Sequence, residues 1–529
     1  MLSVTENIFN MKFINKLFAG IIILSMLFIS CTKNFEDLNT DPNSVSVNNY
    51  PPAYNLTKAQ LEYTGNNDFS YETWRVNIIY CGMMTQHLAN ASWYAGDKYI
   101  QNDAWANAYF DVAYEDQVKY VVDLMALTKD KPAYKNLYQI GRILRVMIFH
   151  RITDIYGDVP YSEAGLGFYS QAFRPKYDTQ QDIYLDMLKE LDEAGSALDP
   201  SADKPGSGDL IYGNTADPIV KWRKLANSIM LRLGMRLTKV DAATAKIWVE
   251  KAYSKGVMTS IADNAFIMHD PNGGRLTVNR NSNILGDGGE WKACQNGEVF
   301  LSRTFIDQLK NTNDPRLQFF ARVQGSGNTT PALQIGLPNG YDQNGGSTDI
   351  STAPGYPGSI NNYSTIRSDI FLSTGGITVL ATYAQQELLL AEAAKRGWTV
   401  GAAASVHYAN GITAAMQQLA QYNSSATISS GDITTYLLAN PYTDSFDQIN
   451  TQYWIACFLD WYETWANWRR SGFPALTPVN YTGNATGGQI PRRMLYPSSE
   501  ASANGPNLTE AITRQGANNF LTRVWWDKQ

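Results

Sequence analysis

Apolar residues recur at spacings of three and four along much of the chain, the pattern of helices that bury one face. Residues 134–155 show it clearly, with Leu137, Ile140 and Leu144 opening the apolar stripe behind Pro132. The pattern and its flanking caps and turns predict further helices, at 178–198, 217–237, 241–253, 298–309, 382–396, 402–422 and 450–470. Because these helices come in successive pairs, the sequence predicts a mainly all-α fold, with a helical-repeat scaffold of the tetratricopeptide kind.

One helix carries an unusually aromatic stripe. Between 450 and 470 the residues at 4-3-4-3 spacing are Trp454, Phe458, Trp461, Trp465 and Trp468. Such a stripe is typical of a helix that faces the core, although a ligand-lining role is the alternative. We therefore interpret it as core.

Two long stretches lack the helical pattern. Residues about 256–375 contain dense turn clusters such as 286–289 and 354–358, so the sequence predicts a loop-rich lobe with little β-structure. The tail, about 472–529, is rich in Pro, Gly and Asn and is predicted to be irregular. Binding residues tend to lie on long ordered loops carried by a rigid scaffold, which makes the lobe the place to look for a site.

The N-terminus has the pattern of an export signal. Lys12 and Lys16 precede the apolar run 17–29, which is shorter than the about 20 residues that a bilayer span needs. The run ends at Ser30-Cys31, similar to a bacterial lipobox, although Phe28 stands where leucine is usual. We predict a signal peptide at 1–30, a lipid on Cys31 and a polar tether at 31–55, before a body at 56–529. Ordinary signal cleavage is the alternative, and the start codon is Met1 or Met11.

Composition narrows the classes of partner. The formal net charge is −6, and there is no basic stretch, so nucleic-acid binding is not expected. Charged residues are only 17% of the chain, against about 25% in typical domains, whereas it holds 31 Tyr and 13 Trp. Aromatic faces and side-chain amides suit neutral polar ligands such as sugars. Cys81, Cys294 and Cys457 have no disulfide or zinc spacing and are predicted to be buried thiols.

Aromatic residues in loops are the candidates for ligand contact. Trp93 and Tyr94 follow an early helix, Trp291 lies in a Gly-rich turn, and Tyr341 stands beside Asn339. Each of the four has a plain alternative as a local packing anchor.

Catalytic and metal sites are not predicted. Asp154, Asp158 and Glu163 could form a carboxylate pair of the kind that glycosidases need. Asp154 and Asp158 flank a helix end, however, where acidic side chains usually bind backbone amides, so we interpret the motif as structural. The histidines show no metal-ligand spacing, the acidic turn 287–290 lacks the EF-hand pattern for calcium, and no cofactor motif is present.

Five segments together resemble one family, the SusD/RagB-like nutrient-binding lipoproteins of the outer membrane. They run in the family's order, and they are Cys31–Asn43 after the signal, Asp154–Ala164, Glu387–Trp398 with its "AEA…RGW" end, Trp461–Pro474 with its "W…RRxGxP" end, and Ile490–Pro497 with Glu500 and Asn504. The matches extend over most of the chain after the signal.

The resemblance implies a fold, a ligand and a partner. It implies four tetratricopeptide-like helix pairs packed against the loop-rich lobe, and a surface-facing lipoprotein that captures glycans. It also implies a TonB-dependent outer-membrane barrel, on which the protein would sit as a hinged lid, and no catalysis. Peptide ligands, as in the RagB branch, are the alternative, and an all-α glycoside hydrolase using Asp158 and Glu163 is a more distant one.

Overall fold

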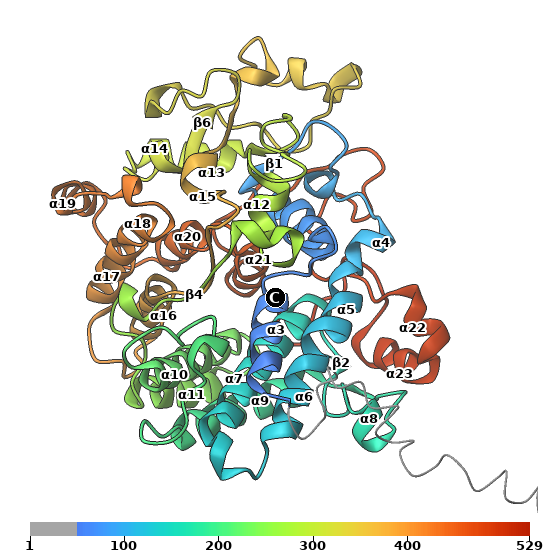
Figure 1. Cartoon of the computed structure of the whole chain (residues 1–529). Coiled ribbons are helices and arrows are strands. Elements are labelled where there is room, and N and C mark those ends of the chain that lie inside the picture. The colour runs from blue at the N-terminus through green and yellow to red at the C-terminus, as the bar shows by residue number, and fades with distance from the viewer. Residues whose placement is uncertain (1–49, 529) are drawn as a thin grey trace, which may run out of the picture. The chain divides into compact units, whose positions relative to one another are not determined.

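Helices that follow one another along the chain also pack side by side (Figure 1). A computed structural model describes residues 50–528. Its contacts divide the chain into two units, Met1–Pro51 and Pro52–Gln529, and the described helices and strands belong to the second unit. The signal peptide, Cys31 and most of the predicted tether lie outside the described residues. The predicted tether nevertheless extended to residue 55, whereas helix α3 (Ala53–Tyr63) begins two residues earlier.

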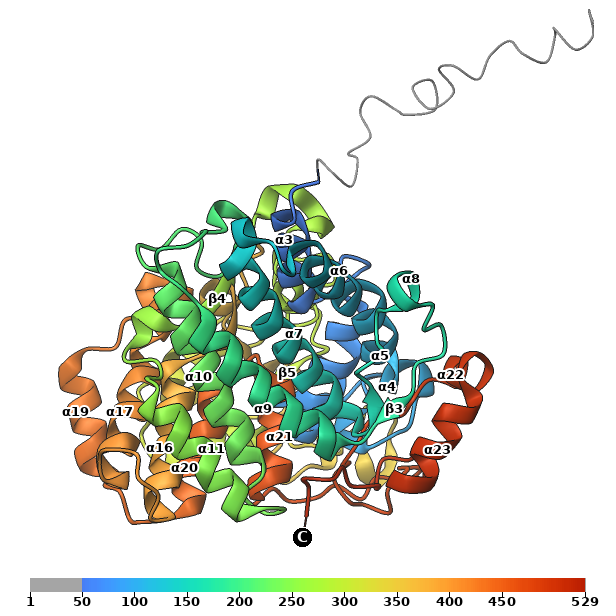
Figure 2. The ribbon, with the colours of Figure 1, turned by 90° about the horizontal axis from the view of Figure 1, so that it is seen from below.

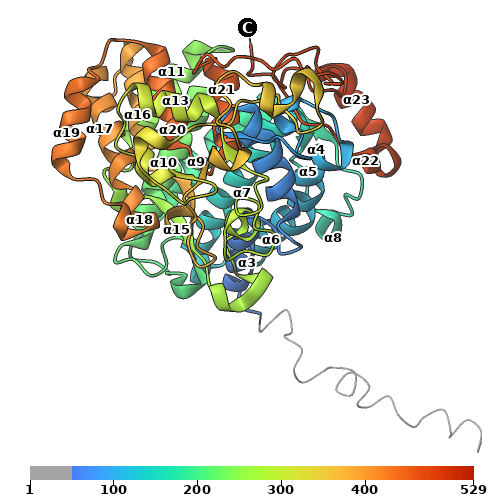
Figure 3. The same ribbon diagram turned by 90° about the horizontal axis from the view of Figure 1, so that it is seen from above.

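The scaffold consists of long helices in sequential pairs. They are α6 (Lys119–Thr128), α7 (Lys135–Tyr156), α9 (Gln180–Ala197), α10 (Pro218–Arg236), α11 (Ala242–Ser254), α16 (Tyr383–Lys395), α17 (Ala404–Gln417), α20 (Phe446–Ala456) and α21 (Trp461–Ser471). Neighbours in this order are in contact from α6 to α11 and again from α16 to α21, and α10 contacts α16 across the loop-rich insertion. Figures 2 and 3 show α17 and α19 at one side of the body and α22 and α23 at the other, with α7 between them. The predicted mainly α-helical fold is confirmed.

Side-chain caps explain where several of these helices begin. Thr179 and Asp241 accept hydrogen bonds from the amides three residues ahead, at the starts of α9 and α11. Thr382 and Gln385 form a reciprocal capping box at the start of α16. Pro218 occupies the first turn of α10, where its missing N–H costs no hydrogen bond. The sequence-based starts are therefore correct to within a few residues.

The aromatic stripe is divided between two helices. We predicted one helix over 450–470, but α20 ends at Ala456 and α21 begins at Trp461. Leu459 has a φ of 77°, which an α-helix does not allow, and Asp460 caps the new helix by accepting from the amide of Glu463. The aromatic side chains of the stripe are buried on both sides of this break, as the core interpretation requires.

Residues 256–375 contain only short elements. They are α12 (Arg280–Leu285), α13 (Arg303–Asn311), α14 (Leu317–Phe320), α15 (Ser368–Phe371), β4 (Ala265–Met268), β5 (Phe300–Leu301), β6 (Ala321–Val323) and β7 (Ser364–Ile366). Within residues 50–528 the strands form two-stranded antiparallel pairs, β1 (Leu88–Ala89) with β5, β2 (Val159–Pro160) with β3 (Tyr177–Asp178), β4 with β8 (Ile377–Ala381), and β6 with β7. The helix predicted at 298–309 begins only at Arg303, because Phe300 and Leu301 pair with β1.

The tail differs from its prediction. Two helices, α22 (Ser498–Ala503) and α23 (Gly505–Gln515), interrupt the stretch that was predicted to be irregular. Only Leu508 and Ala511 of α23 are buried, too short a pattern to recognise in the sequence. The remaining α-helices of the described residues are α4 (Asp103–Ala106), α5 (Ala108–Val112), α8 (Gly167–Ser170), α18 (Leu419–Tyr422) and α19 (Ser430–Ala439), and two segments are π-helical, Thr73–Gly82 and Ala113–Val118. None of the described helices is long and apolar enough to cross a bilayer.

Candidate ligand-binding site

Three of the four aromatic candidates meet at one place. The ring centres of Trp93 and Trp291 lie 6.2 Å apart, and those of Trp93 and Tyr94 lie 4.2 Å apart. Trp93 comes from the loop after β1 and Trp291 from the turn after α12, so the contact joins segments about 200 residues apart. The loop-rich lobe thus contributes one side of this cluster.

Three further aromatic residues, missed in the sequence, complete the cluster. The ring centre of Trp74 lies 4.6 Å from that of Trp291, and the ring centre of Trp105 lies 5.8 Å from that of Trp93. Phe69 packs against Trp291 at 6.2 Å. We call Phe69, Trp74, Trp93, Trp105 and Trp291 the aromatic platform. A signal for it was available, since three tryptophans fall between residues 74 and 105.

A cation lies among the rings of the platform. The Arg75 guanidinium carbon is 3.8 Å from the ring centre of Trp74, 4.8 Å from that of Trp105 and 5.5 Å from that of Trp93. The Nε and Nη1 atoms of Arg75 are buried and have no hydrogen-bond partner among the described residues. Burial lowers the pKa of Arg75 from its ordinary value. Cation–π attraction to several ring faces compensates for part of this loss of solvent.

Hydrogen bonds fix the positions of two platform rings, Trp74 and Trp291. Trp74 donates from Nε1 to the Tyr94 hydroxyl at 2.6 Å, and Trp291 donates from Nε1 to Glu298 Oε2 at 2.5 Å. Tyr94 is fully buried, so it supports its neighbours and presents no face to solvent. Trp93, in contrast, is 41% exposed. The platform therefore offers a partly exposed indole on a fixed base, and indole rings stack on the C–H faces of sugars.

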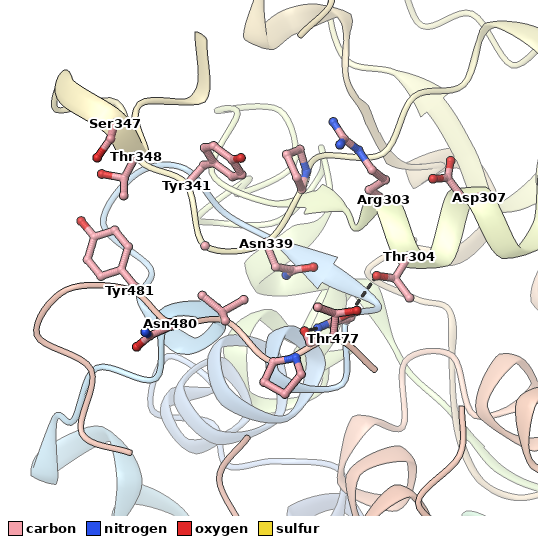
Figure 4. A pocket seen from close by; sticks show the side chains of 15 residues that line it. Arg303, Thr304, Asp307, Asn339, Tyr341, Ser347, Thr348, Thr477, Asn480 and Tyr481 are labelled. Carbon is pink, nitrogen blue, oxygen red and sulfur yellow. Dashed lines mark hydrogen bonds between the residues drawn. The ribbon is translucent and has the colours of Figure 1, made fainter. Parts of the chain in front are cut away.

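Tyr341, the fourth candidate, lies in a separate pocket of about 530 Å³. We call this the tyrosine pocket; it is lined by Gln86, Arg303, Thr304, Asp307, Pro338, Asn339, Gly340, Tyr341, Ser347, Thr348, Thr477, Pro478, Val479, Asn480 and Tyr481. Figure 4 shows Tyr341 and Tyr481 toward one end, Arg303, Thr304 and Asp307 toward the other, and Asn339 between them. No platform residue lines it.

The segment that carries Trp93 also borders this pocket. Asp97 Oδ2 accepts from the amide of Gly340 at 3.3 Å and from Asn339 Nδ2 at 3.4 Å. Lys98 donates from Nζ to the carbonyl of Asn90 at 2.8 Å, which closes the loop between them. The loop that presents Trp93 is thus fastened to the floor of the tyrosine pocket.

The acidic motif at 154–163 is used for structure. Asp154 is buried and accepts from Arg236 Nε at 3.1 Å and from Trp526 Nε1 at 3.0 Å. Asp158 accepts from the Gln180 amide at 2.9 Å and from Arg514 Nε at 2.7 Å, although burial raises its pKa. Glu163 accepts from the amide of Lys176 at 3.0 Å. These partners support the structural interpretation of the motif.

The other polar candidates are also engaged. The Arg470 guanidinium binds Glu392 through two nitrogens, each at 2.7 Å. In the acidic turn, Asp287 pairs with Arg322 and Glu290 with Arg275. Cys81, Cys294 and Cys457 are buried free thiols, which confirms that prediction. Within residues 50–528 no group of His, Cys, Asp and Glu side chains has the geometry of a metal site.

Comparison with known proteins gives a consistent family. No curated protein matches the sequence significantly. Among solved structures, a protein described as chitin-binding shares 34% identity and a TM-score of 0.78, covering 90% of this chain and all of its own. A SusD-like protein of Bacteroidetes AC2a shares 26% identity with a TM-score of 0.77, covering 91% of this chain and 100% of its own. A chitin-binding SusD homologue of Flavobacterium johnsoniae has the same fold, with 24% identity and a TM-score of 0.72, covering 90% and 98%.

The sequence profile of the SusD-like family described as "Starch-binding associating with outer membrane" matches residues 42–497. That range includes the platform and the tyrosine pocket. The chain therefore belongs to the SusD-like family of starch-binding proteins that associate with the outer membrane.

Proposed function

We propose that this protein is a surface-facing lipoprotein that captures glycans on its aromatic platform and passes them to a TonB-dependent outer-membrane transporter. The observation that carries the proposal is the exposed Trp93 indole, held beside Trp291 and Trp74 over the Arg75 guanidinium. Stacking on such rings selects sugars by their apolar C–H faces, and affinity follows from several rings acting together. The lipid on Cys31 would keep the body beside its transporter.

The relatives favour a particular glycan. The protein that shares 34% identity over its full length is described as chitin-binding, and the family profile is described as starch-binding. We therefore expect chitin oligosaccharides to bind more tightly than starch oligosaccharides. Peptides are the other ligand class to test.

The carboxylates beside Trp291 are engaged by neighbouring side chains. Of the nearby carboxylates, Glu298 accepts the indole N–H of Trp291, and Glu290 is paired with Arg275. Hydrolysis of a glycosidic bond needs two carboxyl groups at a set separation, one of them protonated. We therefore propose binding without cleavage.

Isothermal titration calorimetry with chitohexaose, maltohexaose and a casein tryptic digest tests the proposal. We expect Trp93→Ala to weaken glycan binding by about 2 kcal/mol, roughly 30-fold in Kd. Phe168→Ala is the matched control, because Phe168 is 89% exposed and lies outside the platform. Equal losses in both variants, binding of peptides alone, or product formation that Asp158→Asn abolishes would each contradict the proposal.

A further inference from the structure

The tyrosine pocket has walls that are fixed without a ligand. The buried Asp342 carboxylate accepts from the Tyr481 hydroxyl at 2.7 Å and from Thr348 Oγ1 at 2.8 Å. This ties the 341–348 loop to the tail segment that carries Tyr481. The orientation of the Tyr481 ring at the pocket's edge therefore does not depend on an occupant.

The opposite wall is fixed by a glutamine. Gln86 donates from Nε2 to the carbonyl of Thr477 at 2.6 Å and accepts from Thr304 Oγ1 at 2.7 Å. Helix α13, the turn before β1 and the tail are held together by this one side chain, and Figure 4 shows the bonds. Three segments that are distant in sequence thus close around one cavity.

Several polar groups that line this cavity have no partner among residues 50–528. The Tyr341 hydroxyl, the Asp307 carboxylate and the Ser347 hydroxyl make no hydrogen bond or ion pair within the described part of the chain. Arg303 donates from Nη2 to the carbonyl of Pro354 at 2.8 Å. The lining therefore combines fixed rings with unused donors and acceptors, the composition of a site for a hydroxyl-rich molecule.

The charges of the lining point to an uncharged ligand. Arg303 and Asp307 carry opposite charges at the same end of the pocket (Figure 4). Asp307 would accept from one sugar hydroxyl while Arg303 donates to its neighbour, and Tyr341 and Tyr481 would meet the ring faces at the other end. The volume of about 530 Å³ falls within the about 300–1,000 Å³ of small-molecule sites.

We infer that the tyrosine pocket is a second saccharide subsite, separate from the aromatic platform, that binds a short neutral stretch of glycan. The inference rests on the proposed function, because it takes the ligand class from it. It adds that the protein holds glycan at two places, which are joined by the loop that Asp97 and Lys98 fasten.

Saturation-transfer NMR on the full-length protein, with chitotriose, maltotriose and trialanine as probes, tests this inference. Four proteins are compared, namely the wild type, Trp93→Ala, the pocket variant Asp307→Asn/Asn480→Ala, and the combination of all three substitutions. Asp307 and Asn480 are exposed, so these substitutions leave the core intact. Asp217→Asn is the matched control, since Asp217 is exposed at the start of α10 and its side chain caps no amide.

We expect Trp93→Ala to keep saturation transfer to a trisaccharide. In the combined variant we expect this transfer to be at least tenfold weaker than in the wild type. Loss of all transfer in Trp93→Ala would overturn the pocket and leave the platform. Transfer that survives in the combined variant, or to trialanine alone, would also overturn the pocket. If the pocket variant alone abolishes binding while Trp93→Ala changes nothing, the pocket stands and the platform fails. No transfer from the wild type to any saccharide contradicts both.

Discussion

The indole Nε1 of Trp74 lies 2.6 Å from the hydroxyl oxygen of Tyr94, and this bond joins a π-helical segment to the loop that presents Trp93. Both partners are buried, so neither has water as an alternative partner. The exposed part of the platform is therefore positioned by a hydrogen bond that no ligand touches. The contribution of this hydrogen bond to stability can therefore be measured separately from its effect on ligand binding.

Tyr94→Phe should reveal this bond. The substitution leaves the buried Trp74 N–H without an acceptor, which costs about 1–3 kcal/mol of unfolding free energy. Trp74→Phe/Tyr94→Phe removes both partners, so its cost should be smaller than the sum of the two single variants. Urea unfolding of all four proteins gives the coupling energy directly.

The same proteins test the link to the ligand. We expect Tyr94→Phe to weaken chitohexaose binding several-fold, because the ring that Trp93 packs against at 4.2 Å would lose the hydroxyl that holds it to Trp74. A coupling energy of zero, together with unchanged affinity, would show that the bond does not organise the platform.

Gly340 is a second position where local geometry controls a site. Its φ is 85°, and a Cβ placed there would lie 2.5 Å from Val479 Cγ1. Gly340→Ala should therefore cost the backbone penalty of about 1–2 kcal/mol and an additional amount for the overlap. Gly345→Ala is the matched control, because Gly345 has a φ of 79° but open space around its Cβ.

Differential scanning calorimetry of the two variants separates these contributions. We expect Gly340→Ala to lower the Tm more than Gly345→Ala, and Gly340→Ala/Val479→Ala to recover the difference. Equal shifts in Tm for the two single variants would mean that the Val479 side chain can move away at little cost and that the loop and the tail are not packed tightly together.

Helix periodicity was enough to predict the scaffold because the helices bury one stripe each. The stripe in α7 and the caps of α9 and α16 are local features, so they are visible in the sequence. The break between α20 and α21 was not visible, since the apolar spacing continues through Leu459 while the backbone turns. The pairing of Phe300 with Ala89 that shortens α13 is likewise a long-range contact.

The candidate site was likewise predictable only in part. Trp93 and Trp291 were recognisable as loop aromatics, but only the fold shows that they meet each other and Trp74. Tyr94 has the same sequence context as Trp93 and yet is buried, because its hydroxyl binds the Trp74 indole. Tyr481 and Asp307 gave no sequence signal, since they reach the tyrosine pocket from separate segments.

The lipid anchor predicted at Cys31 can be tested by detergent partitioning. Expressed with its own signal in a bacterial host that acylates lipoproteins, the wild type should enter the detergent phase of Triton X-114. Cys31→Ser should remain in the aqueous phase, because the acyl chains supply the membrane affinity. Cys294→Ser, at a buried thiol of the body, is the control and should partition like the wild type. Detergent partitioning of Cys31→Ser would contradict lipidation at this residue.

Acid should weaken the body through Glu392. Burial by itself would raise the pKa of this carboxyl, but the Arg470 and Arg396 guanidinium groups outweigh it and lower the pKa from 4.5 to about 2. A carboxyl with a lowered folded-state pKa adds stability that is complete above its unfolded value and is lost as pH falls toward the folded value. Between pH 5 and pH 2 the contribution is on the order of 3 kcal/mol.

Glu392→Gln isolates this contribution. Glu72 acts in the opposite direction, because burial raises its pKa to about 7 and its stabilising effect grows as pH falls. The difference between wild type and Glu392→Gln cancels the Glu72 contribution, so it should shrink steadily from pH 5 to pH 2 in urea unfolding. Glu510→Gln, at a residue that is exposed on α23, should follow the wild type at every pH. Parallel curves for wild type and Glu392→Gln would mean that the pair with Arg470 does not depress the pKa of Glu392.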